Sequence, residues 1–241
     1  GASGRMGSTV VQAVTAAADL SLAAQVDIGW SATDLTSNNV RVAVDFTTPQ
    51  ATEANVHQLI DLGVHAVVGT SGWDKASLGR LSEHLAQQPN VGVLVAPNFA
   101  LGAVLSELLA VQAVKFFESV EMIEMHHPDK LDAPSGTACH TAEALAAARR
   151  NSKMPSIPDA TVTALPGARG AAVEDVRVHA VRLRGLVAHQ EILLGNPGEL
   201  LTIRHDSLDR VSFMPGVLLA IRQVAAHPGL TVGLDQFLEL T

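Results

Sequence analysis

The first hundred residues alternate between short apolar runs and longer segments in which apolar positions recur every three or four residues. Such short runs are typical of buried parallel strands, and the longer segments are typical of amphipathic helices. We expect strands at 20–26, 40–46, 64–69 and 91–96, and helices at 8–18, 49–62 and 75–87. Strands that alternate with helices predict βαβ units around a parallel sheet covered on both faces.

The pattern changes after Pro97. We expect helices at 100–117, 137–150 and 216–226, and strands at 120–127, 176–183, 186–194 and 200–205. Turn signals join the last three strands, which predicts an antiparallel meander. The segment 151–170 is rich in proline and glycine and predicts a long loop of the kind that is usually functional or mobile.

The chain opens with GASGRMG (residues 1–7), directly before a helical pattern. Glycines let a backbone approach a pyrophosphate closely, and a helix N-terminus supplies unpaired N–H groups. Asp27 lies at the end of the next expected strand, where a carboxylate accepts hydrogen bonds from an adenosine ribose. The glycine loop alone is equally consistent with a plain turn, but its position and Asp27 favour dinucleotide binding. Because such a loop normally follows a strand, we expect a fragment that lacks the first strand of the sheet.

Composition excludes several classes of function. A formal charge of −8 argues against a surface that follows nucleic-acid phosphates, and an aromatic content of 3% without tyrosine argues against base stacking. No apolar stretch is long enough for a membrane helix, and we see no export signal. The single Cys139 cannot form an internal disulfide, which fits the cytoplasm.

The segment 121–137 carries the most chemistry. Two histidines end an expected strand, Lys130 follows in a loop, and Ser-Gly-Thr opens a helix. Lysine, protonated imidazole and the N–H groups of a helix start form an anion pocket with acid–base groups attached. Glu124 lies on the same side of the strand as His126 and could orient its ring. We do not expect a metal, because adjacent histidines point to opposite faces and are poor joint ligands.

The segment EMIEMHHPDKLDAPSGTA (residues 121–138) resembles the signature of the dihydrodipicolinate reductase family, E-(V/I)-x-E-x-H-x-x-x-K-x-D-x-P-S-G-T-A. Met122 at the aliphatic position is a mild departure. The glycine loop, VDFTTP (44–49), GTSGW (69–73) and APNFALGAVL (96–105) also resemble family segments, in family order. The resemblance covers the whole chain. Within the family, the chain is similar to the actinobacterial members.

The resemblance implies an α/β fold with two domains. Residues 1–97 and 211–241 would form a Rossmann-like, doubly wound parallel-sheet domain for the dinucleotide, with its first strand absent from this chain. Residues 98–210 would form a second α/β domain with a mixed sheet, which binds substrate and builds a homotetramer. Hinges are expected near Asn98 and Arg210.

The resemblance also implies the reaction, the NAD(P)H-dependent reduction of 4-hydroxy-tetrahydrodipicolinate to tetrahydrodipicolinate in lysine and diaminopimelate biosynthesis. His126 would be the general acid/base and Lys130 the proton donor, and His127, Gly136 and Thr137 would hold the dicarboxylate substrate. The implied cofactor contacts are Gly1, Ala2, Ser3, Gly4, Arg5, Met6, Asp27, Gly69, Thr70, Ser71, Ala96, Pro97, Asn98 and Phe99.

Asp27 has no cation next to it in the sequence to meet a 2′-phosphate, whereas Arg5 could reach one from the glycine loop. We therefore expect use of both NADH and NADPH, with NADH favoured or equal. The loops at 69–72 and 96–99 also fit ordinary turns. Two other functions stay open: another two-domain reductase of the amino-acid or homoserine dehydrogenase type, and a nucleotide-binding sensor without catalysis.

Overall fold

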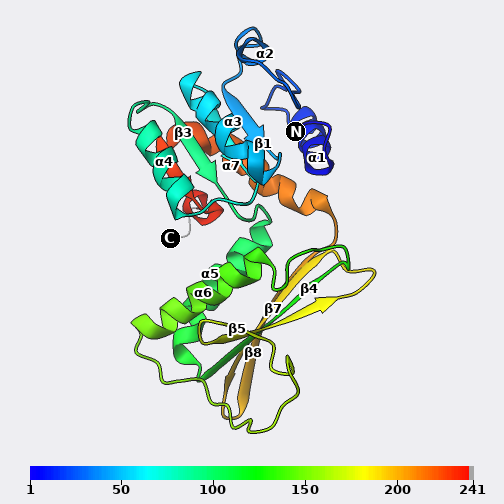
Figure 1. Cartoon of the computed structure of the whole chain (residues 1–241), viewed down its shortest axis with the longest axis vertical. Helices are drawn as coiled ribbons and strands as arrows, with labels where there is room; N and C mark the ends of the chain where they lie inside the picture. Colours follow the sequence, from blue (N-terminus) through cyan, green and yellow to red (C-terminus); the bar gives the residue numbers. More distant parts are fainter. Residues whose placement is uncertain (239–241) are drawn as a thin grey trace. The chain divides into compact units, whose positions relative to one another are not determined.

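The computed structural model describes residues 1–238. The chain divides into two compact units (Figure 1). Unit 1 contains Gly1–Leu101 and the chain from Arg210 onward, and unit 2 contains Gly102–Asp209. Among the residues described, no helix combines the length and the apolar character needed to cross a membrane.

Unit 1 is built on a parallel sheet of four strands, in the order β1-β2-β3-β9. The strands are β1 (Val42–Asp45), β2 (His65–Val68), β3 (Gly92–Val95) and β9 (Gly229–Val232). The helices are α1 (Arg5–Ala16), α2 (Ala32–Thr36), α3 (Pro49–Asp61), α4 (Lys75–Leu85) and α7 (Met214–Gln223). Strand β3 is buried along its whole length, as its continuous apolar run predicts. The Rossmann-like character of this part is thereby confirmed.

One strand prediction for unit 1 was wrong, and one strand was missed. Residues 20–26 form no strand, because a strand requires a ladder of hydrogen bonds to a neighbour. Instead, the carbonyl of Val26 accepts hydrogen bonds from the backbone N–H groups of Gly1 and Ala2. Strand β9 was not expected, because four residues after a helical tail give too short a pattern.

Unit 2 contains a mixed sheet of five strands, as expected from the resemblance, in the order β5-β6-β4-β7-β8. The strands are β4 (Ser119–His126), β5 (Ala171–Val173), β6 (Val176–Arg182), β7 (Ala188–Asn196) and β8 (Glu199–Ser207). The helices are α5 (Leu101–Ala113) and α6 (Gly136–Asn151), and a 3₁₀ turn at Val114–Phe116 follows α5.

The expected meander of the last three long strands was wrong. Strands β7 and β8 form an antiparallel hairpin, but β4 lies between β6 and β7. Strand β4 is parallel to β6 and antiparallel to β7. A central strand buries alternate residues, and β4 does so with Val120, Met122 and Glu124. Glu124 is therefore a carboxyl group in the buried row, and this places it at the centre of the candidate site.

Candidate active site

The glycine loop packs so closely that side chains are excluded at two of its positions. A Cβ atom at Gly7 would lie 1.9 Å from the carbonyl oxygen of Gly1, and one at Gly1 would lie 2.3 Å from that of Phe46. Helix α1 begins at Arg5, directly after Gly4. A tight glycine turn before a long helix leaves backbone N–H groups and a positive dipole end for a phosphate. These residues fit a dinucleotide.

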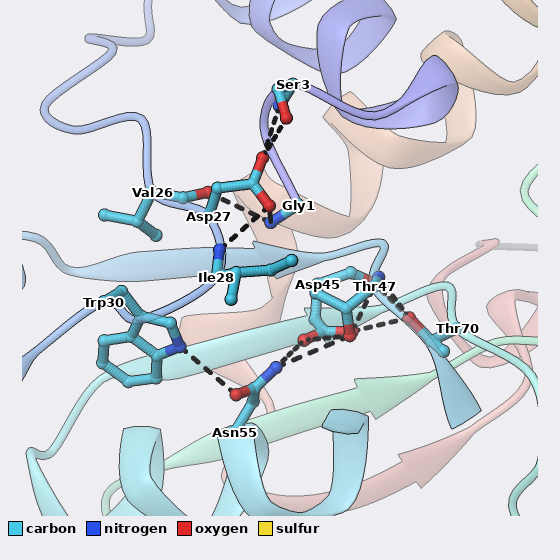
Figure 2. A network of polar contacts seen from close by, with 10 residues as sticks. All are labelled: Gly1, Ser3, Val26, Asp27, Ile28, Trp30, Asp45, Thr47, Asn55 and Thr70. Carbon is cyan, nitrogen blue, oxygen red and sulfur yellow. Dashed lines mark hydrogen bonds and ion pairs between the residues drawn. The ribbon is translucent and has the colours of Figure 1, made fainter. Parts of the chain in front are cut away.

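Asp27 is tied to this loop (Figure 2). The backbone N–H of Ser3 donates to Asp27 Oδ2 over 2.9 Å, its hydroxyl donates to the same oxygen, and the N–H of Ile28 donates to Oδ1 over 3.0 Å. Hydrogen bonds from the hydroxyl and the backbone N–H of Ser3, and to a smaller extent from the N–H of Ile28, lower the pKa of Asp27 to about 2. The side chain remains 40% exposed. An ionised carboxylate with free lone pairs is suited to accept hydrogen bonds from ribose hydroxyls.

A second carboxylate, that of Asp45, lies at the centre of a hydrogen-bond network at the carboxyl end of β1 and was not predicted from the sequence (Figure 2). Asp45 is 6% exposed and accepts hydrogen bonds from the hydroxyls of Thr70 (2.6 Å), Thr47 (2.9 Å) and Thr52 (3.0 Å). The side-chain amide of Asn55 donates to its other oxygen over 3.0 Å. Asp45 therefore joins the ends of β1 and β2 to helix α3. The available signal was an aspartate that ends an apolar run and is followed by threonines.

Asn55 extends this network to the loop that follows Asp27. Its side-chain oxygen accepts a hydrogen bond from the indole N–H of Trp30 over 3.2 Å (Figure 2). The backbone N–H of Trp30 in turn donates to the carbonyl of Asp27. The turn that carries Asp27 and the loop that carries Thr70 are thus linked through hydrogen bonds of buried and half-buried groups.

The other expected cofactor residues in unit 1 follow β2 and β3. A Cβ at Gly69 would lie 2.0 Å from the ring of Phe46, whereas Ser71 and Pro97 are exposed. Asn98 accepts a hydrogen bond from the N–H of Ala100, as turn residues do. Phe99 is buried and meets the ring of Phe46 edge to face, with ring centroids 5.8 Å apart. The two loops therefore combine packing and turn roles with exposed residues.

In unit 2, His126 contacts the buried Glu124. The ring Nδ1 of His126 lies 2.5 Å from Glu124 Oε2, and the guanidinium of Arg182 donates to both carboxylate oxygens, over 2.9 and 2.8 Å. Burial raises the pKa of Glu124, but the hydrogen bonds from His126 and Arg182 outweigh it and hold the pKa below the ordinary value. Glu124 is therefore an ionised acceptor next to the ring.

Lys130 and the start of α6 bind one carboxylate together. Lys130 Nζ lies 2.7 Å from Asp132 Oδ1, and the N–H of Gly136 donates to Asp132 Oδ2 over 3.2 Å. Burial raises the pKa of Asp132, but the hydrogen bond and charge of Lys130, together with backbone hydrogen bonds that include the N–H of Gly136, outweigh it, so that the pKa is lowered. A Cβ at Gly136 would meet no atom within 4 Å, so the space beside this N–H is open.

The structure also places the two remaining expected substrate residues. His127 follows the last residue of β4 and is half-buried, and its carbonyl accepts a hydrogen bond from the N–H of Lys130. Thr137 is half-buried in the first turn of α6, beside Gly136. A lysine, two histidines and a helix N-terminus thus lie within one short segment of unit 2.

Comparison with known proteins decides the family. A family model described as "Dihydrodipicolinate reductase, N-terminus" matches residues 1–99, and one described as "Dihydrodipicolinate reductase, C-terminus" matches residues 102–238. The chain belongs to the dihydrodipicolinate reductase family. This confirms the resemblance of the signature at 121–138, and members of this family are pyridine-nucleotide-dependent oxidoreductases of lysine and diaminopimelate biosynthesis.

Individual members of the dihydrodipicolinate reductase family match over their full length. The 4-hydroxy-tetrahydrodipicolinate reductase of Beutenbergia cavernae is 62% identical over 240 residues, which cover 100% of this chain and 97% of that protein. The enzyme of the same name from Nocardia farcinica is 57% identical, with the same coverage. A dipicolinate-bound dihydrodipicolinate reductase from Paenisporosarcina sp. TG-14 has a TM-score of 0.84 and 36% identity, and the match covers 99% of this chain and 97% of that one.

Proposed function

We propose that this chain reduces 4-hydroxy-tetrahydrodipicolinate to tetrahydrodipicolinate with NADH or NADPH. The observation that carries the proposal is the carboxylate of Asp132, which is held by Lys130 and by the N-terminus of α6. The segment that binds this carboxylate also carries His126, whose ring is held by an ionised Glu124. The relative from Paenisporosarcina was solved with dipicolinate, which is itself a dicarboxylate.

In the proposed complex, a carboxylate of the substrate takes the place of Asp132. The N–H groups of Gly136 and Thr137 and the side chain of His127 hold it, which releases Lys130 from its pair with Asp132. Charge-assisted hydrogen bonds to backbone N–H groups at a helix start are short and strong, and they leave the ring of the substrate in a fixed orientation.

The proton is delivered by His126 and Lys130. Nδ1 of His126 is engaged by Glu124, so Nε2 is the ring atom that holds or gives a proton. The ammonium of Lys130 is the donor to the substrate carbon, and its charge also stabilises negative charge that develops on the ring. Loss of the 4-hydroxyl group as water gives the conjugated cyclic imine that is reduced. When bound, the reduced nicotinamide would supply the hydride, and the hydride and the proton together account for the two hydrogens that the imine gains.

The cofactor residues in this proposal lie in unit 1. The backbone of residues 1–6 holds the pyrophosphate, Asp27 accepts hydrogen bonds from the ribose, and the loops at Gly69–Ser71 and Ala96–Phe99 contact the nicotinamide end. We propose use of both cofactors, with NADH favoured or equal, because Asp27 is ionised and repels a 2′-phosphate, whereas Arg5 attracts it.

Three further proposals concern the domains, the oligomeric state and the cellular location of the protein. Residues 1–97 and 211–241 bind the dinucleotide, and residues 98–210 bind substrate and form a homotetramer. The sheet face of unit 2 that carries Ile123 exposes Val181 and Leu200, and apolar groups of this kind favour burial between subunits. The free thiol of Cys139 accords with a cytoplasmic location.

Turnover of the substrate tests the proposal. The substrate is generated enzymatically in the cuvette, and oxidation of NADH and of NADPH is followed by absorbance. We expect rapid oxidation that depends on the substrate, and its loss in a Lys130→Ala, His126→Ala double variant. Binding of NADH without any oxidation in the presence of substrate would contradict the proposed activity and favour a sensor.

A further inference from the structure

Arg182 and Glu124 form an ion pair in unit 2 that the mechanism above does not use in full. Strand β6 runs parallel to β4, and Arg182 is the register partner of His126. From this position its guanidinium reaches Glu124, which has 0% of its side chain exposed. Both guanidinium NH groups donate to the carboxylate, one to each oxygen. The pairing is therefore bidentate and fixes the plane of the carboxylate.

Glu124 determines which nitrogen of His126 carries hydrogen. Its Oε2 accepts from Arg182 and lies 2.5 Å from Nδ1 of His126. A carboxylate that is ionised accepts hydrogen bonds only, so Nδ1 must be the donor. The exchangeable proton position of His126 is then Nε2. An oriented ring with a fixed tautomer is the arrangement that general acid–base catalysis requires.

The same pair reaches the anion site. Glu124 Oε1 accepts a hydrogen bond from the backbone N–H of Ser135, the residue that caps α6, over 3.3 Å. Arg182 donates to the carbonyl of Asp132 over 2.7 Å. The loop that carries Lys130 and the helix start at Gly136 are therefore attached to the same two side chains that hold His126.

We propose that Arg182 and Glu124 together are the positioning unit of this active site. Arg182 keeps Glu124 charged and in plane, Glu124 holds the ring of His126, and both fix the loop and helix start that bind the substrate carboxylate. A purely structural ion pair is often replaceable by apolar residues without loss of stability. Here such a replacement releases the acid–base residue and the anion site together. The inference rests on the proposed function.

Four variants test it: Arg182→Met, Arg182→Lys, Glu124→Gln and, as matched control, Arg150→Met. Arg150 lies in the same unit and forms an exposed ion pair with Glu174, so its replacement removes an ion pair outside the site. For each variant we would measure kcat and KM for substrate over pH 5–9, the Kd of dipicolinate and of NADH by calorimetry, and the unfolding temperature.

We expect Arg182→Met to lower kcat by at least about tenfold, which is less than the hundredfold or more that complete loss of a positioned proton donor costs. Its Kd for dipicolinate should rise severalfold, whereas its Kd for NADH should match the wild type. Arg182→Lys should recover part of kcat, because it retains the charge but not the fork. Glu124→Gln should move the alkaline limb of the pH–rate profile to lower pH, since the ring loses its anionic partner.

A folded Arg182→Met variant with the wild-type kcat, dipicolinate affinity and pH profile would overturn the inference. If that variant does not fold, the double variant Glu124→Gln, Arg182→Met removes both buried charges, and full kcat in it would be equally decisive. Failure of the wild-type chain to turn over substrate would instead overturn the proposed function. In that event, unchanged dipicolinate binding in the Arg182 variants would overturn the inference separately.

Discussion

The carboxylate of Asp45 accepts a hydrogen bond of 2.6 Å from the hydroxyl of Thr70, which lies at the end of the neighbouring strand. The contact follows from the parallel register, because Asp45 is the partner of Val68 and Thr70 comes two residues later. Thr70 is one of the proposed cofactor contacts. The position of its loop therefore depends on a carboxylate that does not itself need to touch the cofactor.

We predict that Asp45→Asn weakens NADH binding by about tenfold and lowers the free energy of unfolding by about 1–3 kcal/mol, the cost of disturbing buried hydrogen bonds. The amide of asparagine keeps one acceptor oxygen for the three threonine hydroxyls, but its NH₂ group replaces the oxygen that accepts from Asn55, so that two donors face each other. Calorimetric titration with NADH and urea unfolding measure the two effects. Asp61→Asn, at a side chain 67% exposed, is the control. An unchanged Kd for NADH despite the loss of stability would make the network purely structural.

Cofactor choice should respond to Asp27 and Arg5 in opposite directions. Asp27→Ala should raise kcat/KM for NADPH relative to NADH, and Arg5→Ala should lower it, each by about tenfold or less, as expected for charges in a solvated site. Comparing both cofactors in wild type and the two variants measures this. A wild type that prefers NADPH by more than about tenfold would mean that Asp27 does not face the ribose.

The preference for NADH over NADPH should also depend on pH, in a direction that follows from the charges involved. The pKa of Asp27 is lowered to about 2, so the carboxylate stays ionised above that pH and loses its charge only as pH falls through it. The 2′-phosphate, by contrast, loses one of its charges near pH 6. Lowering the pH from 8 to 5 should therefore reduce the discrimination against NADPH. Asp27→Ala should not show this reduction, because only the attraction between Arg5 and the phosphate then remains, and it weakens as the phosphate loses charge. An identical change in that variant would exclude Asp27 as its cause.

The anion site can be blocked at Gly136. A valine there would fill the open space beside the N–H that now donates to Asp132. We predict that Gly136→Val raises the Kd of dipicolinate by about tenfold or more, since hydrogen bonds to charged groups contribute about 1.5–3 kcal/mol each. The Kd of NADH should not change.

Gly79→Val is the matched control for this site, because a Cβ at Gly79 in α4 also meets no atom within 4 Å. It should leave dipicolinate binding unchanged. Equal loss of NADH and dipicolinate binding in Gly136→Val would show that the substrate pocket has been assigned to the wrong residues.

Glu121, the first glutamate of the signature, forms an ion pair with Arg169. The guanidinium of Arg169 also pairs with Asp159, and His179 contacts the same Glu121. Arg169→Ala should therefore release the segment 151–170 and speed its cleavage in limited proteolysis. Arg150→Ala, which breaks an exposed pair with Glu174, is the control and should cleave as the wild type does. Equal cleavage rates in all three proteins would show that Arg169 does not hold this segment.

The sequence could predict contacts in the site only where the two interacting residues lie close together along the chain. The alternation of β4 places Glu124 on the same side as His126, and this was visible from a spacing of two residues. Arg182 was not, because its contact with Glu124 depends on the pairing of β6 with β4. The expected meander put β6 beside β7 and so hid that contact. Turn residues in sequence cannot show which of two long-range partners a strand selects.

The cofactor side shows the same limit. The glycine loop and Asp27 follow from local spacing, and their hydrogen bonds through Ser3 join them as the pattern indicates. Asp45, the last residue of β1, accepts hydrogen bonds from α3 and from Thr70 beyond β2, which only the folded register brings together. Residues 20–26 have the composition of a strand, but composition does not supply the neighbour that a ladder requires.

The central claim is that Lys130 and His126 deliver the proton to a substrate held in unit 2. The most direct measurement is kcat of Lys130→Ala at saturating substrate and NADH, together with the Kd of NADH from calorimetry. We predict that kcat falls by about a hundredfold or more, the usual contribution of a positioned proton donor, while the Kd of NADH is unchanged. A kcat close to that of the wild type would contradict the role assigned to Lys130.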